Sequence, residues 1–244
     1  MRELLCALLL VLGPPAGADP TLPGCTGGIA PSPSAEEGLD GYAGPVSQSR
    51  AHPFDGTYNA MIAGPGVASA DLPAVPGGVY DLSVWSGSTK PGLATATGFQ
   101  FFDRDNIQVG RTYAGWPLAE KPKRHNSYGM IAPPGAATVR FFATTDAEIH
   151  WDCVFLRVSA YDVELTAMDG TFRITVTNTG SEPLTNLTVD LPACEGLDRT
   201  PFDLKDQVIR TCTGVATGRV TATVSGALYW NGALPDRSAA LELG

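Results

Sequence analysis

The sequence predicts an all-β protein that consists of a jelly-roll β-sandwich followed by a smaller Ig-like β-sandwich. Short segments alternate apolar and polar residues at period two, as half-buried strands do. The 244 residues include 28 Gly and 20 Pro, which favour turns between short strands over long helices. No segment shows a convincing 3.6-residue helical period.

The first half of the chain contains the strands expected to form the jelly roll. In VYDLSVWSG, residues 79–87, Asp81, Ser83 and Trp85 alternate with apolar side chains. Arg104-Asp105-Asn106 is predicted to be a hairpin turn. Several short strands in a segment of this size suit a jelly roll. The predicted strands are 57–64, 79–87, 97–103, 107–113, 124–133, 138–145 and 147–158.

The composition changes after Ala160, which predicts a domain boundary there. The stretches TFRITVTNT and LTNLTVDL alternate strongly, and further strands are expected at 207–213, 218–228 and 239–243. Six or seven strands in about 80 residues predict an Ig-like sandwich. The expected domains are therefore a jelly roll over 31–160 and an Ig-like domain over 161–244.

The N-terminus has the pattern of a secretory signal peptide. Arg2 precedes the apolar run Leu4–Leu12, and Ala16-Gly17-Ala18 is a cleavage signal, so residues 1–18 are expected to be removed. Residues 19–30 form a Pro- and Gly-rich lead-in. The apolar run is too short to span a bilayer. We therefore expect a secreted or extracellular protein without membrane insertion, which is either free or retained at the cell surface. Attachment of a lipid at Cys25 fits the sequence less well.

Export predicts how the five cysteines are used. Cys6 leaves with the signal peptide, and the remaining four allow three pairings. Cys194 and Cys212 are close in sequence and lie in the same later segment, which leaves Cys25 to pair with Cys153. Free buried thiols are the alternative, and a zinc site fits less well because no C-x₂-C spacing occurs.

The stretch AEIHWDCVFLRV, residues 147–158, reads as a strand that is buried on both sides. An unpaired carboxylate in a core is costly, so Asp152 needs a partner. Strict alternation places Ile149, Trp151, Cys153 and Phe155 on one face and His150, Asp152, Val154 and Leu156 on the other.

Charge and motifs narrow the function. The net charge is −9 and no basic patch stands out, which argues against nucleic acid binding. None of H-E-x-x-H, G-x-S-x-G or a P-loop occurs, so a non-catalytic protein is expected. A small hydrolase that uses the acidic cluster Glu36, Glu37 and Asp40 is the alternative.

Residues 30–160 resemble the jelly-roll carbohydrate-binding modules of the family 4/9 type. The strand VYDLSVWSG, the turn APPGAATVRFFA and the strand HWDCVFLRV carry part of the resemblance. The family's N-terminal pattern is matched by Glu36, Gly38, Leu39, Gly41, Tyr42, Gly56, Tyr58 and Ala60.

This resemblance implies one structural Ca²⁺, with Glu36 and Asp152 as oxygen ligands. The chain departs from the family at Cys153, where a second aspartate is usual, and at Ala35, where an aromatic is usual. Hydrogen bonds to Asp152 without a metal are the alternative.

Sugar binding requires aromatic faces for stacking and polar groups for hydroxyls. The predicted ligand-binding residues are Trp85, Tyr113, Trp116 and Tyr128, with Tyr42 as a further candidate. Each of them is also a candidate for core packing.

The later domain resembles the Ig-like repeat of bacterial surface proteins known as domain of unknown function 11. The carrying residues are ITVTNTGSEPLTNLTVDLP, Cys194 and Cys212-Thr213. The resemblance implies a spacer and supports the Cys194–Cys212 bond. We therefore predict an exported, non-catalytic protein whose jelly roll binds an extracellular or cell-wall polysaccharide. The alternative is a structural or protein-interaction module of the bacterial cell envelope.

Overall fold

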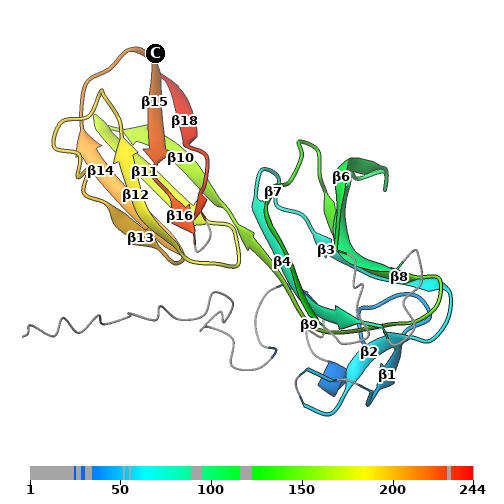
Figure 1. Ribbon diagram of the computed structural model, residues 1–244. Helices are drawn as coiled ribbons and strands as arrows, with labels where there is room; N and C mark the ends of the chain where they lie inside the picture. The colour runs from blue at the N-terminus through cyan, green and yellow to red at the C-terminus, as the bar shows by residue number, and fades with distance from the viewer. Residues whose placement is uncertain are drawn as a thin grey trace, which may run out of the picture.

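The computed structural model is built from β-strands (Figure 1). It describes residues 25, 29–30, 35–51, 53–54, 56–88, 95–115, 123–229 and 232–243, so the predicted signal peptide lies outside the described residues. A single turn of 3₁₀-helix, η1, covers Ala35–Glu37 in this part of the chain. Within it, no helix is long and apolar enough to cross a membrane. The all-β prediction is confirmed.

The first sandwich packs two antiparallel sheets face to face. The front sheet has the strand order β1-β2-β9-β4-β7, and the back sheet has the order β3-β8-β5-β6. The front-sheet strands are β1 (Ser47–Ser49), β2 (Asn59–Ile62), β4 (Val79–Gly87), β7 (Lys123–Ile131) and β9 (Ile149–Ser159). The back-sheet strands are β3 (Gly66–Pro73), β5 (Ala96–Phe102), β6 (Gln108–Gly115) and β8 (Thr138–Thr145).

Aromatic side chains fill the space between the front and back sheets. Tyr80, Phe99, Phe101, Phe141 and Trp151 are each fully or almost fully buried in this core. Phe99 and Phe101 meet edge to face at 5.5 Å, a geometry that aromatic quadrupoles favour. Burying such a side chain stabilises the fold by about 1.5–3 kcal/mol. The first core therefore packs against the inner face of the front sheet and leaves its outer face free of this core.

The second sandwich also packs two sheets, β10-β11-β14 against β17-β16-β12-β15-β18, with β13 beside β12. Its strands are β10 (Tyr161–Met168), β11 (Thr171–Asn178), β12 (Leu184–Asp190), β13 (Phe202–Leu204), β14 (Gln207–Thr213), β15 (Gly218–Ser225), β16 (Leu228–Tyr229), β17 (Gly232–Ala233) and β18 (Arg237–Leu243). The predicted Cys194–Cys212 disulfide is confirmed, with the two Cα atoms 5.7 Å apart.

The two cores meet where β9 continues almost directly into β10. Only Ala160 separates the two strands. The first core draws its residues from the chain up to Ala160, and the second draws them from Tyr161 onward, with Val79 of β4 added. The change in composition after Ala160 thus coincides with the passage from one core to the other.

The sequence missed β3 because its inward residues are small. Ala68 and Ala70 face the core, whereas Val67 is exposed. An alternation of alanine with larger or polar residues lacks the contrast that marks a half-buried strand. The strand is held by its pairing with β8 along its whole length.

Strict alternation along β9 is wrong after Asp152, because the strand contains a β-bulge. In the ladder with β4, Ser83 pairs with Phe155 but Trp85 pairs with Asp152, so β9 carries one extra residue. Cys153 has a φ of 49°, the left-handed conformation that accommodates such an insertion.

The bulge changes which side chains share a face. The first core contains Ile149 and Trp151 before the bulge and Val154, Leu156 and Val158 after it. Cys153 and Phe155 instead pack together outside this core. The prediction that β9 is buried on both sides is confirmed, but Trp151 does not share a face with Phe155.

Candidate binding face

The outer face of the front sheet carries a row of polar and aromatic side chains from β4. Tyr80, Leu82 and Val84 point into the core, so Asp81, Ser83 and Trp85 point outward. In the ladder with β7, Ser83 pairs with Asn126 and Trp85 pairs with Arg124. Directly paired residues lie on the same face of a sheet. These β4 and β7 residues, with Phe155 of β9, form what we call the binding face.

Phe54 and Trp85 form an aromatic pair on the binding face. Their ring centroids are 4.3 Å apart and the rings are tilted by 33°. Trp85 also packs against Cys25, Cys153 and Phe155, a small buried cluster distinct from the core. Phe54 is 54% exposed, whereas Trp85 is partly buried. The pair thus presents an exposed ring on a supported base.

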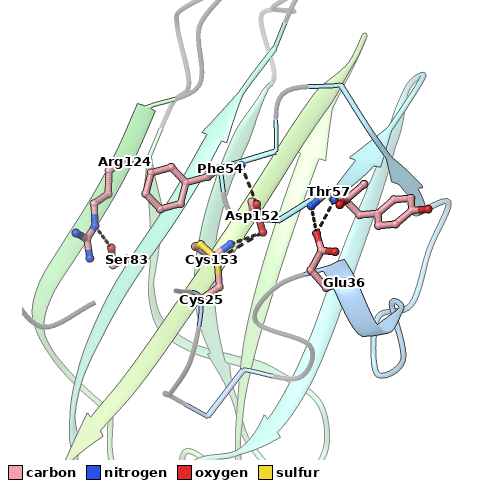
Figure 2. The surroundings of a disulfide bond; sticks show 9 residues. Cys25, Glu36, Phe54, Thr57, Ser83, Arg124, Asp152 and Cys153 are labelled. Atoms are coloured by element: carbon pink, nitrogen blue, oxygen red, sulfur yellow. Dashed lines mark hydrogen bonds between the residues drawn. A yellow bond between two sulfur atoms is a disulfide. The ribbon is translucent and has the colours of Figure 1, made fainter. Parts of the chain in front are cut away.

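Asp152 holds the segment that carries Phe54 (Figure 2). The backbone N–H of Phe54 donates to Asp152 Oδ2 at 2.9 Å, and the N–H of Cys153 donates to Oδ1 at 2.9 Å. Asp152 is only 2% exposed, so these charge-assisted bonds form away from water. They supply the partners that a buried carboxylate needs.

Glu36 holds the other end of the same segment. Its Oε1 accepts the backbone N–H of Thr57 at 2.6 Å and that of Tyr58 at 2.5 Å. Figure 2 shows the Glu36 and Asp152 carboxylates reaching the segment from different elements, η1 and β9. The position of Phe54 is therefore set by two carboxylates rather than by the loop itself.

Polar groups flank the aromatic pair on β4 and β7. Arg124 Nε donates to Ser83 Oγ at 2.6 Å, which directs the guanidinium across the two strands. Asn126, opposite Ser83, is exposed. Guanidinium, hydroxyl and amide groups can donate to or accept from the hydroxyl groups of a ligand. The binding face thus combines a stacking surface with hydrogen-bonding groups.

The disulfide between Cys25 and Cys153 is confirmed, with the Cα atoms 4.7 Å apart. It ties the lead-in to β9 at the bulge. The Ile29 N–H donates to Leu156 O at 2.7 Å, so the lead-in also bonds to the strand beside the disulfide. The bond contributes the small apolar cluster on which Trp85 rests.

The carboxylates predicted to bind calcium face backbone N–H groups. Within the described residues, the metal-competent group of three side chains is Cys25, Asp152 and Cys153, and Glu36 is not part of it. Its two sulfur atoms are joined in the disulfide, so it does not supply the oxygen-rich shell that Ca²⁺ prefers. Both carboxylate oxygens of Asp152 and Oε1 of Glu36 already accept backbone N–H groups, for which a cation would have to compete. These residues fit backbone anchoring better than calcium binding.

Two of the other predicted aromatics, Tyr113 and Tyr42, lie away from the binding face. Tyr113 packs against Phe99 at 5.1 Å, at the edge of the core. The Tyr42 and Trp151 ring centroids are 6.1 Å apart, and burial raises the pKa of the Tyr42 hydroxyl. Trp116 and the side chain of Tyr128 lie outside the described residues.

Phe54 is the binding-face residue that sequence reasoning missed. It lies in His52-Pro53-Phe54-Asp55-Gly56, a stretch with turn residues and no alternation. A large aromatic side chain in such a loop has no strand neighbours to bury it. This is the signal that could have identified it.

His150 belongs to a buried network behind the Phe54 segment. Its Nε2 lies 3.2 Å from Glu148 Oε1, and its Nδ1 lies 3.4 Å from Asn59 Nδ2. The same Asn59 amide donates to Ala51 O at 2.6 Å. The histidine thus supports the start of the segment that leads to Phe54.

Residues 43–156 match a family described as "Domain of unknown function (DUF7850)". This range contains the binding-face residues on β4, β7 and β9 and also Phe54. No curated protein matches the chain.

Solved structures similar to the chain include a phage enzyme domain and carbohydrate-binding modules. The enzymatically active domain of tailspike protein 4 from bacteriophage CBA120 is 15% identical with a TM-score of 0.42, covering 53% of this chain and 21% of that one. A family 16 carbohydrate-binding module is 19% identical with a TM-score of 0.39, covering 50% and 94%. The C-terminal family 22 module of Clostridium thermocellum Xyn10B is 18% identical with a TM-score of 0.39, covering 50% and 89%.

Proposed function

We propose that this protein is an exported, non-catalytic, polysaccharide-binding protein, and that the binding face of the front sheet is its sugar site. The observation that carries the proposal is the Phe54–Trp85 pair: Phe54 is 54% exposed, its ring packs on Trp85, and its backbone N–H donates to the buried Asp152 carboxylate. An exposed aromatic ring that is backed by a second aromatic side chain offers a flat surface for stacking.

The chemistry of the binding face suits a sugar ring. A pyranose presents apolar C–H groups on one face and hydroxyls around its rim. The Phe54 ring supplies a flat apolar surface, while Arg124, Ser83 and Asn126 supply donors and acceptors beside it. Because the Phe54 backbone is hydrogen-bonded and its ring packs on Trp85 before binding, less conformational entropy is lost when a ligand stacks on it.

Export is supported by the disulfides and by the leader pattern. The Cys25–Cys153 and Cys194–Cys212 bonds are typical of oxidising compartments. Following the resemblance of its sequence to bacterial Ig-like repeats, we assign the second sandwich a spacer role.

Retention on insoluble polysaccharides tests the proposal. The panel should include peptidoglycan, and soluble oligosaccharide products should be assayed to detect hydrolysis. We expect retention without product release. Phe54→Ala should weaken binding roughly tenfold, since a lost stacking contact is worth about 1–1.5 kcal/mol. Phe54→Trp should retain binding because it keeps an aromatic face.

The control is Met168→Ala, which removes a 75% exposed apolar side chain far from the binding face, on β10. It should bind like the wild type. If the folded wild-type protein were retained on no polysaccharide, the proposal would fail. The structural or protein-interaction role in the cell envelope would then be favoured.

A further inference from the structure

The binding face continues along β4 toward the second sandwich. Trp85, Ser83 and Asp81 follow one another on the outer side of β4. Four residues of strand span about 13 Å. The ladder with β9 places Arg157 directly opposite Asp81. A ligand stacked on Phe54 and extended along β4 would therefore reach the Asp81 end of the strand.

The second sandwich contributes side chains at that end. Glu182 Oε1 lies 3.8 Å from Arg157 Nε. The Tyr229 hydroxyl of β16 lies 3.7 Å from the point where a Cβ on Gly129 would be. The N–H of Gly129 in turn donates to Asp81 Oδ1 at 2.7 Å. Tyr229 thus reaches β7 beside Asp81, at the end of the binding face away from Phe54.

The electrostatics agree with this placement. Burial raises the pKa of the Tyr229 hydroxyl, and the negative charge of Asp81 raises it further. Asp81 is only 2% exposed, so its charge affects Tyr229 although the carboxylate itself is not accessible to a ligand. Tyr229 itself is partly exposed, as is Arg157. The polar groups at this end that are partly exposed are therefore the Tyr229 phenol and the Arg157 guanidinium.

Hydrogen bonds hold the second sandwich in place at this junction. Arg237 Nη2 donates to Gly77 O at 3.1 Å, and the Ser181 N–H donates to Val158 O at 2.8 Å. Val79 of β4 is buried in the second core. The position of Tyr229 relative to β4 is thus set by direct bonds and packing rather than by a flexible linker.

We infer that Tyr229, with Arg157, forms a second sugar subsite at the junction of the two sandwiches. The inference rests on the proposed function. The ligand class is a linear oligosaccharide long enough to contact Phe54 at one end and Tyr229 at the other. The second sandwich is then part of the binding site as well as a spacer.

Oligosaccharides of increasing length test this assignment. They are prepared from a polysaccharide that retains the wild-type protein, and their affinities are measured by isothermal titration calorimetry on the full chain. Wild-type affinity should rise with chain length to a plateau. Tyr229→Ala should remove that rise, a loss of roughly tenfold for the longest ligand, and leave the affinity for the shortest ligand unchanged. Phe54→Ala should weaken binding at every length.

Leu228→Ala is the matched control, since Leu228 is an exposed neighbour of Tyr229 whose side chain points to the other face of β16. It should behave like the wild type. Absence of all glycan binding by the wild type would refute the proposed function itself. Wild-type affinity that does not depend on length, or a Tyr229→Ala effect equal at all lengths or absent, would overturn the second subsite while leaving the first intact.

Discussion

Replacement of Asp152 tests how the Phe54 segment is anchored. Asp152→Ala removes the acceptor of two backbone N–H bonds, each 2.9 Å long, at a residue that is 2% exposed. A hydrogen bond to a charged group is worth about 1.5–3 kcal/mol. With two such bonds lost, we expect Asp152→Ala to lower the free energy of unfolding by about 3–6 kcal/mol. Asp152→Asn keeps one carbonyl oxygen and should lose about half as much.

Urea unfolding followed by tryptophan fluorescence measures this loss, because Trp85 and Trp151 both lie in the first sandwich. The expected loss is large against the 5–15 kcal/mol that typically stabilises a domain. Asp152→Asn should also weaken glycan retention, since Phe54 loses its anchor.

Asp71→Asn is the matched control for the same chemical change. Asp71 pairs with Arg140 on the surface of the back sheet, and its side chain is 48% exposed. An exposed ion pair contributes about 0–1 kcal/mol. If Asp152→Asn destabilised the protein no more than this control, the claim that the carboxylate anchors the segment would be refuted.

Three further predictions concern the disulfide of the second sandwich, calcium and alkaline pH. The double variant Cys194→Ala/Cys212→Ala removes a disulfide between residues 18 apart in sequence, and its free energy of unfolding in urea should be lower by about 3 kcal/mol. An unchanged urea midpoint would contradict this prediction. Backbone N–H groups bond to Glu36 and Asp152, so the melting temperature should be the same in chelator and in calcium. A bound Ca²⁺ at a hundredfold excess over its Kd would stabilise the protein by about 2.7 kcal/mol, and a gain of that size would restore the calcium site. Burial, assisted by the charge of Asp236, raises the pKa of Tyr161 to about 12. The stabilisation of the folded protein by the neutral Tyr161 hydroxyl is therefore fully present below the pKa of about 10 that tyrosine has in the unfolded chain, and it is lost as the pH rises to 12. The loss should be about 2–3 kcal/mol and should be absent in Tyr161→Phe; an equal decline in both proteins would show that another group titrates.

Much of the fold could be predicted because strand alternation is a local property. The segment 79–87 is a strand with the predicted bounds, and 138–145 is another. The hairpin turn at Arg104-Asp105-Asn106 is present between β5 and β6, with Asn106 at a φ of 59°. The four cysteines that follow the predicted signal peptide, together with their spacing, led to both disulfides.

The candidate site could be predicted only in part. Trp85 was identified because its strand neighbours Asp81 and Ser83 are polar. Phe54 was not, because it reaches Trp85 through a hydrogen bond to Asp152, 98 residues away in sequence. Tyr229 meets Gly129 only because the second sandwich docks on the first.

The sequence by itself determined the all-β class, the positions of most strands and the partners of the cysteines. The tertiary structure decided which face of β9 each side chain occupies, since the bulge at Cys153 reverses the alternation without a glycine to mark it. It also decided which loop covers Trp85 and which groups hold Asp152. Alternation follows from the backbone geometry of a single strand, whereas ladder register and docking depend on contacts between segments that lie far apart in the chain.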